Sequence, residues 1–171
     1  MLNANEIADY FIELSTPGTK ENITNLKLQK LLYYAQGEYV AHNEESNDEI
    51  LFNDRIEAWK HGPVVPEVYR RFSNYIFNEI SKTEINKASI IKIKEEKLDI
   101  FLDDVWGLYG NYNGKQLERM SHMESPWQRT RGELPTYVSS NKEISPQVIK
   151  EFFSEREWEV VETFFINKFY S

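Results

Sequence analysis

The stretch from Asn25 to Ala41, NLKLQKLLYYAQGEYVA, decides the fold of this chain. Its apolar side chains recur at the i, i+3, i+4, i+7 and i+11 spacing of a buried helical stripe. They are Leu28, Leu31, Leu32, Ala35 and Tyr39. Thr24, directly before the stretch, is a good N-cap residue. The pattern predicts a long helix that turns this stripe to the core and carries Lys27, Lys30 and Gln36 on its other face.

Shorter helices are predicted on both sides of this stretch. Asn3 and Glu6 have the spacing of a capping box for a first helix, which the segment STPGT, residues 15–19, ends. Further helical patterns begin at Pro66, in EKLDIFLDDVWGLYG (96–110), in NGKQLERMSH (113–122), at Pro146, and at a second capping box formed by Ser154 and Glu157. In the second of these, Leu108 is predicted to face the core and Gly110 to end the helix.

Two short runs alternate at period two and predict strands, namely Ile56–Trp59 and Ile90–Ile93. We expect these two runs to pair. A chain of 171 residues is long enough for one sizeable core, so we expect a compact single domain over residues 1–171. The predicted fold class is mainly α (α+β), with about six to eight helices and a small two-stranded antiparallel ribbon.

The composition restricts the possible function classes. The chain has no cysteine, which excludes disulfide frameworks, thiol catalysis and Cys-ligated zinc. A net charge of −8 repels nucleic-acid backbones, so we expect no nucleic acid partner and find a basic or neutral protein partner the easier fit. We also expect a cytoplasmic protein without a membrane partner, because neither a signal pattern nor a long apolar run is present.

The common signatures of catalysis are missing from the sequence. There is no P-loop, dinucleotide fingerprint, nucleophile elbow or zinc-protease motif. His42, His61 and His122 lie apart and form no i, i+4 ligand pair, although acid–base or metal chemistry with Glu57 or Glu124 is an alternative. We therefore expect a protein that is not an enzyme, with no catalytic residue, no cofactor and no metal.

The segment IEAWKHGPVVPEVYRRF, residues 56–72, predicts a stiff corner. Gly62 and Pro63 form a tight turn after the predicted strand, and Pro66 begins a helix because its missing N–H is not needed there. Ala58 is small enough for close backbone approach. A stiff corner loses little entropy on binding, so the same unit is a suitable mount for a partner surface.

The tryptophans and histidines near this corner have two interpretations. The four tryptophans lie in separate segments, which favours core positions for Trp59, Trp106, Trp127 and Trp158. Alternatively, the two beside proline turns, Trp59 and Trp127, are partly exposed interface anchors. If His61 and His122 lie close in space, we expect a shared hydrogen-bond network rather than a proton relay.

Three segments together resemble the Panacea domain, a family of antitoxins and phage-associated proteins that includes the SocA-like antitoxins. They are KLQKLLYYAQ (27–36), AWKHGPVVPEVY (58–69) and LERMSHMESPW (117–127). The resemblance spans about residues 3 to 165. One departure is Met120-Ser121, where the family more often has Leu-Thr, and both replacements are conservative in size.

The resemblance implies a mostly helical domain that neutralises a co-encoded protein toxin by direct contact. In one branch of the family the antitoxin is instead an adaptor that delivers its toxin to a protease, so a protease is an alternative partner. A small histidine-dependent or metal-dependent hydrolase is the alternative from another class. The motif residues expected at a partner-binding surface are Trp59, His61, Gly62, Pro63, Val65, Pro66, Tyr69, His122, Pro126 and Trp127. The acidic run NEESNDE (43–49) is a solvated loop or a docking patch, and the oligomeric state stays open.

Overall fold

A computed structural model of the chain describes residues 1–43 and 50–156. Within these ranges the chain is mainly helical with one two-stranded antiparallel sheet, which confirms the predicted fold class. The elements are α1 (Ala4–Leu14), α2 (Asn25–His42), β1 (Glu57–Trp59), β2 (Gly62–Val64), α3 (Pro66–Arg71), η1 (Ser73–Tyr75), η2 (Lys82–Glu84), α4 (Lys87–Glu95), α5 (Asp99–Tyr109), α6 (Gly114–Met123), α7 (Ser125–Arg131) and α8 (Pro146–Glu155).

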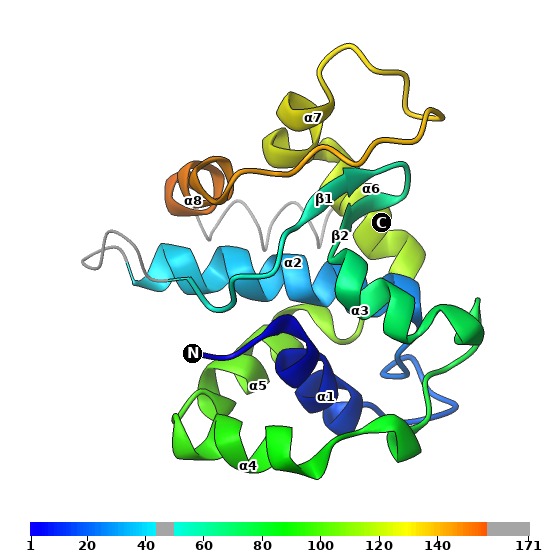
Figure 1. Cartoon of the computed structure of the whole chain (residues 1–171), viewed down its shortest axis with the longest axis vertical. Coiled ribbons are helices and arrows are strands. Elements are labelled where there is room, and N and C mark those ends of the chain that lie inside the picture. Colours follow the sequence, from blue (N-terminus) through cyan, green and yellow to red (C-terminus); the bar gives the residue numbers. More distant parts are fainter. Residues whose placement is uncertain (44–49, 157–171) are drawn as a thin grey trace, which may run out of the picture.

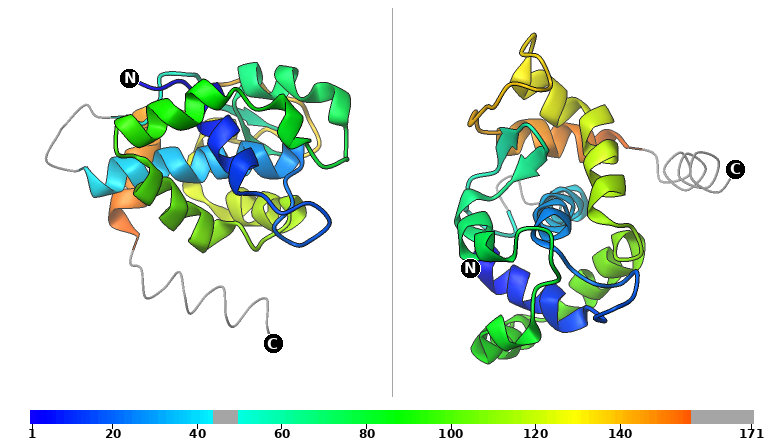
Figure 2. Two further views of the ribbon diagram at one scale, coloured as in Figure 1. Left: turned by 90° about the horizontal axis from the view of Figure 1, so that it is seen from below. Right: turned by 90° about the vertical axis from the view of Figure 1, so that its right-hand side faces the viewer.

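Helix α2 is the centre of the molecule. Figure 1 shows α7, α8 and the hairpin on one side of it and α1, α4 and α5 on the other, and the right-hand view of Figure 2 shows the same order from the side. Helices α1, α5, α6 and α8 all pack directly against it. The predicted stripe is buried apart from Tyr39, which is half-buried, and Thr24 caps the helix as expected.

The other face of α2, which carries Lys27, Lys30 and Gln36 as the sequence indicated, is not exposed to solvent either. Lys27, Lys30 and Gln36 are buried, at 1%, 0% and 3% exposure. A helix surrounded on all sides leaves no face for water, so each of these side chains must find a partner inside the protein. Lys27 Nζ donates to the Gly110 carbonyl at 2.6 Å, and Gln36 Oε1 accepts from the backbone N–H of Leu51 at 3.1 Å.

The partner predicted for the first strand was wrong. Strand β1 pairs with β2 in a tight hairpin, with Trp59 opposite Gly62. Ile90–Ile93 instead lies inside α4, where Ile93 is buried and Ile91 is exposed. The isoleucines at positions 90 and 93 also satisfy the i, i+3 spacing of a helix, which is why the local pattern misled.

Several local predictions are confirmed by the helix ends. Asn3 and Glu6 form a capping box on α1, Pro66 begins α3, and Gly110 is the C-cap of α5. Leu108, however, is 40% exposed rather than buried.

The end of the chain differs in part from the prediction. The helix that begins at Pro146 was expected to end at Ser154, but α8 continues through Ser154 to Glu155. Helix α7 was not predicted. Ser154 therefore does not begin the expected last helix, and the rest of that prediction, from Glu157 on, lies outside the described residues, as do residues 44–49 of the acidic run. None of the described helices has the length and apolar character needed to span a bilayer.

Candidate partner-binding corner

We use the word corner for residues 57–72 together with helices α6 and α7. Within it, side chains from α2 hold strand β2 and the residue that follows this strand. Lys30 Nζ donates to the Pro63 carbonyl at 2.7 Å, and Gln29 Oε1 accepts from the backbone N–H of Val65 at 2.9 Å. Burial lowers the pKa of Lys30 to about 7, partly opposed by the negative charge of Glu118. The corner therefore contains a buried amine that loses its proton near neutral pH.

Side chains from α7 hold the first half of the hairpin. Trp127 Nε1 donates to the Trp59 carbonyl at 2.8 Å, and Arg131 Nη1 donates to the Ala58 carbonyl at 3.0 Å. The Arg131 guanidinium also lies over the Trp127 ring, 4.9 Å from its centre. Pro126, in the first turn of α7, is buried beside them. These contacts hold the backbone of β1, whereas Lys30 holds that of β2, so both strands of the hairpin are fixed.

Gly62 is the position where the corner tolerates no side chain. Its φ of +95° lies in the region that favours glycine. A Cβ at this position would lie 2.8 Å from Ser121 Oγ and 2.9 Å from Lys30 Cε. Close packing of β2 against α2 and α6 therefore requires glycine here.

The two histidines of the motif make different contacts. His61 Nδ1 lies 2.8 Å from Glu118 Oε1, and Lys115 Nζ lies 2.7 Å from Glu118 Oε2. His122 instead stacks on the Trp127 ring at 4.1 Å between ring centres, and burial lowers its pKa. Its Nε2 has no hydrogen-bond partner among the described residues. Glu118 thus links His61 to Lys115. In the described part of the chain, no three acidic or histidine side chains are grouped to hold a metal ion.

Only some of the motif side chains reach the surface of the corner. Tyr69 is 37% exposed, His61 is exposed, and Trp59 is half-buried with its ring edge-on to Tyr69 at 4.9 Å. Gly62, Pro63, Val65, Pro126 and Trp127 are buried, and Pro66 and His122 are half-buried. The motif residues therefore form two groups. Most are buried or half-buried and support the corner, whereas Trp59, Tyr69 and His61 reach its surface.

A second polar cluster, which sequence reasoning missed, lies on the C-terminal side of α2. Tyr33 and Tyr34 both donate to the Glu124 carboxylate at 2.9 Å. Burial raises the pKa of Glu124 to about 7, although these two hydrogen bonds oppose the shift. In the sequence, Glu124 is an alternative carboxylate partner for a catalytic histidine, but in the structure its carboxylate accepts hydrogen bonds from two tyrosines. Beside it, the buried Glu38 accepts from Tyr109 Oη.

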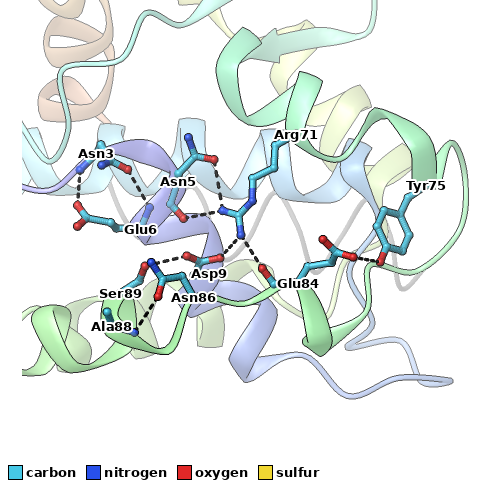
Figure 3. A network of polar contacts seen from close by, with 10 residues as sticks. All are labelled: Asn3, Asn5, Glu6, Asp9, Arg71, Tyr75, Glu84, Asn86, Ala88 and Ser89. Carbon is cyan, nitrogen blue, oxygen red and sulfur yellow. Dashed lines mark hydrogen bonds and ion pairs between the residues drawn. The ribbon is translucent and has the colours of Figure 1, made fainter.

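A third polar network joins α1, α3 and α4, as Figure 3 shows. Arg71 Nη2 donates to Asp9 Oδ1 at 2.6 Å and to the Glu84 carbonyl at 2.7 Å, while Ser89 Oγ donates to Asp9 Oδ2 at 2.7 Å. A polar cavity of about 530 Å³ opens beside Asp9 and Arg71. Because both carboxylate oxygens of the buried Asp9 are bonded, this network explains the packing of three helices without a ligand.

Comparison with known proteins agrees with the arrangement of the three motif segments. The family model described as "Antitoxin SocA-like, Panacea domain" matches residues 28–128, which include most of α2, the hairpin and the start of α7. The chain is also 32% identical to Antitoxin SocA of Caulobacter vibrioides (strain NA1000 / CB15N) over 158 residues, which is 88% of this chain and 79% of that protein. No solved structure matches it significantly. The chain belongs to the family of SocA-like antitoxins that carry the Panacea domain.

Proposed function

We propose that this protein neutralises a protein toxin encoded beside it by binding the toxin directly, as a binding protein rather than an enzyme. Membership in an antitoxin family supports a cognate toxin as the partner. We place the toxin-binding surface at the corner because of one observation. A hairpin held by Lys30, Trp127 and Arg131 presents an aromatic pair to solvent there.

Physical reasons favour this corner as the contact surface. A rigid backbone loses little conformational entropy on binding, so more of the contact energy appears as affinity. Tryptophan and tyrosine side chains dominate the energy of many interfaces, and Trp59 and Tyr69 lie together here at the surface. The net charge of −8 additionally favours encounter with a basic partner.

The test is co-expression of the chain with the product of the adjacent reading frame, followed by growth and pull-down. We expect a neighbour that is toxic alone and harmless in a stoichiometric complex. Replacement of Tyr69 by alanine should weaken the complex about tenfold or more, the loss typical of an interface aromatic. Tyr137, which is 73% exposed on the loop after α7, gives the matched control in Tyr137→Ala.

Three outcomes would contradict parts of this proposal. A neighbour that is neither toxic nor bound would overturn the function. A neighbour that forms no stable complex but has a shorter lifetime when this chain is present would replace binding with delivery to a protease. Equal affinities for Tyr69→Ala and Tyr137→Ala would move the contact surface away from the corner.

A further inference from the structure

The chain that directly follows the corner carries an exposed apolar tip. We call residues 73–78, SNYIFN, the tip. Phe77 is 90% exposed, more than any other large hydrophobic side chain among the described residues, and Ile76 beside it is 65% exposed. Figure 1 shows this segment at the edge of the molecule, between α3 and α4. Single exposed apolar side chains are common, so the pair needs a second observation before it indicates a function.

The backbone of the tip provides that observation. The Asn78 N–H donates to the Tyr75 carbonyl at 2.8 Å, which closes a four-residue turn with Ile76 and Phe77 at its centre. Ile76 has a φ of 55° and a ψ of −101°, close to the values of the first central residue of a type II′ turn, where glycine is the usual residue. A positive φ is an outlier for a β-branched residue. Lys97, the other non-glycine residue with positive φ in the described ranges, directly follows the C-cap of α4, where this conformation is common.

Both ends of the tip are fixed to the body of the protein. Phe72 before it and Ile80 after it are buried. The Ile80 N–H donates to the Ile23 carbonyl at 2.8 Å, and Tyr75 Oη donates to Glu84 Oε1 at 3.0 Å, as Figure 3 shows. Backbone strain persists only where the surrounding structure enforces it, and such strain is concentrated at functional sites. The tip is therefore a preformed turn that loses little entropy on binding.

The charge of the tip selects the kind of partner. All six of its residues are uncharged, in a chain of which 28% is charged. An apolar centre without charged residues is typical of the inner part of a protein interface. An anionic membrane is an unfavourable partner, because the tip has no basic residue and the chain has a net charge of −8. A second copy of the chain is unfavourable as well, since both copies carry this charge. A neutral or basic protein with an apolar recess fits best.

We infer that the tip inserts Phe77, with Ile76 beside it, into an apolar recess of the protein toxin. The turn at Ile76 fixes the position of Phe77, and the complex removes from water an apolar side chain that the free protein exposes. The inference rests on the proposed function, since it names a second contact next to the corner. Phe77 would then be an anchor residue beside Trp59 and Tyr69.

The first experiment measures the affinity of the complex with the product of the adjacent reading frame. Phe77→Ser should weaken the complex about tenfold or more, because a buried phenylalanine is a typical anchor. Phe77→Leu, which keeps an apolar side chain, should weaken it about threefold or less. The matched control is Ile100→Ser on α5, which removes a side chain that is 71% exposed and should leave the affinity unchanged. Urea unfolding should give the same midpoint for Phe77→Ser and the wild type, since Phe77 is exposed.

The second experiment separates contact from folding at the neighbouring position. Ile76→Gly removes an exposed side chain and suits the positive φ. It should therefore raise the midpoint of urea unfolding and at the same time weaken the complex about threefold or more. A residue with only a structural role does not give these opposite effects. In addition, the photoreactive p-benzoylphenylalanine at position 77 should crosslink to the toxin, whereas the same group at position 100 should not.

The results distinguish the tip from the proposed function. If the wild type does not bind the neighbour, the proposed function fails and the inference fails with it. If the wild type binds and Phe77→Ser binds equally well, the inference fails and the proposed function stands. An equal loss in Ile100→Ser would attribute the effect to apolar surface in general and overturn the inference. Crosslinking from position 77 to a second copy of the chain, or binding of the wild type but not of Phe77→Ser to anionic phospholipid vesicles, would also overturn it.

Discussion

Replacing Lys30 by methionine should remove a specific part of the pH dependence of folding. Lys30 is fully buried at the centre of the corner, and its Nζ donates to the Pro63 carbonyl at 2.7 Å. Burial lowers its pKa to about 7 in the folded chain, whereas an unfolded chain has a lysine pKa of about 10.4. Methionine has a similar length and volume but does not titrate.

The sign and size of the effect follow from these two pKa values. Below pH 7 the amine is protonated in both states, so its contribution to the free energy of unfolding is constant. Between pH 7 and 10 the unfolded chain keeps a proton that the folded chain has released, so stability rises with pH. From pH 7 to pH 9, Lys30 should add roughly 2 kcal/mol to the free energy of unfolding, at about 1.4 kcal/mol per pH unit once it is neutral.

The assay is urea unfolding followed by tryptophan fluorescence at pH 7 and pH 9. The hydrogen bond to Pro63 is lost equally at both pH values in Lys30→Met, so only the pH increment is compared between the proteins. Lys27, whose pKa burial lowers to about 8, contributes the same increment to both. The wild type should gain about 2 kcal/mol more than Lys30→Met. Increments that agree within experimental error would refute the argument that Lys30 is desolvated and loses its proton near neutral pH.

Three further substitutions test other parts of the structure. Gly62→Ala should destabilise the fold by roughly 2–4 kcal/mol in urea unfolding, because its φ of +95° strains a side chain and the new Cβ would lie 2.8 Å from Ser121 Oγ. Ile76→Gly should raise stability by roughly 0.5–1 kcal/mol, since Ile76 has a φ of 55°, and an unchanged thermal midpoint would contradict this strain. Burial raises the pKa of Glu124 to about 7, so wild-type stability should fall by roughly 2 kcal/mol from pH 5 to pH 8 through this group, and Glu124→Gln should lack that fall in urea unfolding at the two pH values.

The sequence predicted those elements whose signals are local. The caps at Asn3, Thr24 and Pro66 lie where expected because each acts on backbone groups within one helical turn. The predicted pairing of Ile56–Trp59 with Ile90–Ile93 was wrong because the local pattern is ambiguous. The apolar spacing in Ile90–Ile93 is also compatible with one face of a helix. Strand pairing depends on a partner that the local pattern does not identify, and here the partner follows after a two-residue turn.

The candidate site was only partly predictable. The residues of the corner were named from their pattern and from the resemblance, but their supports Lys30 and Arg131 were not, because an amphipathic helix is assumed to turn its charges to water. The partners of these two side chains are carbonyl groups of Pro63 and Ala58, which are distant in sequence.

The supports of the corner and its exposed side chains should respond differently to mutation, and this difference decides how loss of neutralisation is interpreted. Lys30 and Arg131 satisfy hairpin carbonyls from inside, so their replacement leaves a buried acceptor unpaired and costs stability of the whole chain. Tyr69 is partly exposed, and the interactions of its backbone do not depend on its side chain. A variant at Lys30 that fails to neutralise the toxin therefore reports on folding unless its unfolding free energy is unchanged, whereas a failing Tyr69→Ala with wild-type stability reports on contact. Measuring both quantities for each variant separates the two causes.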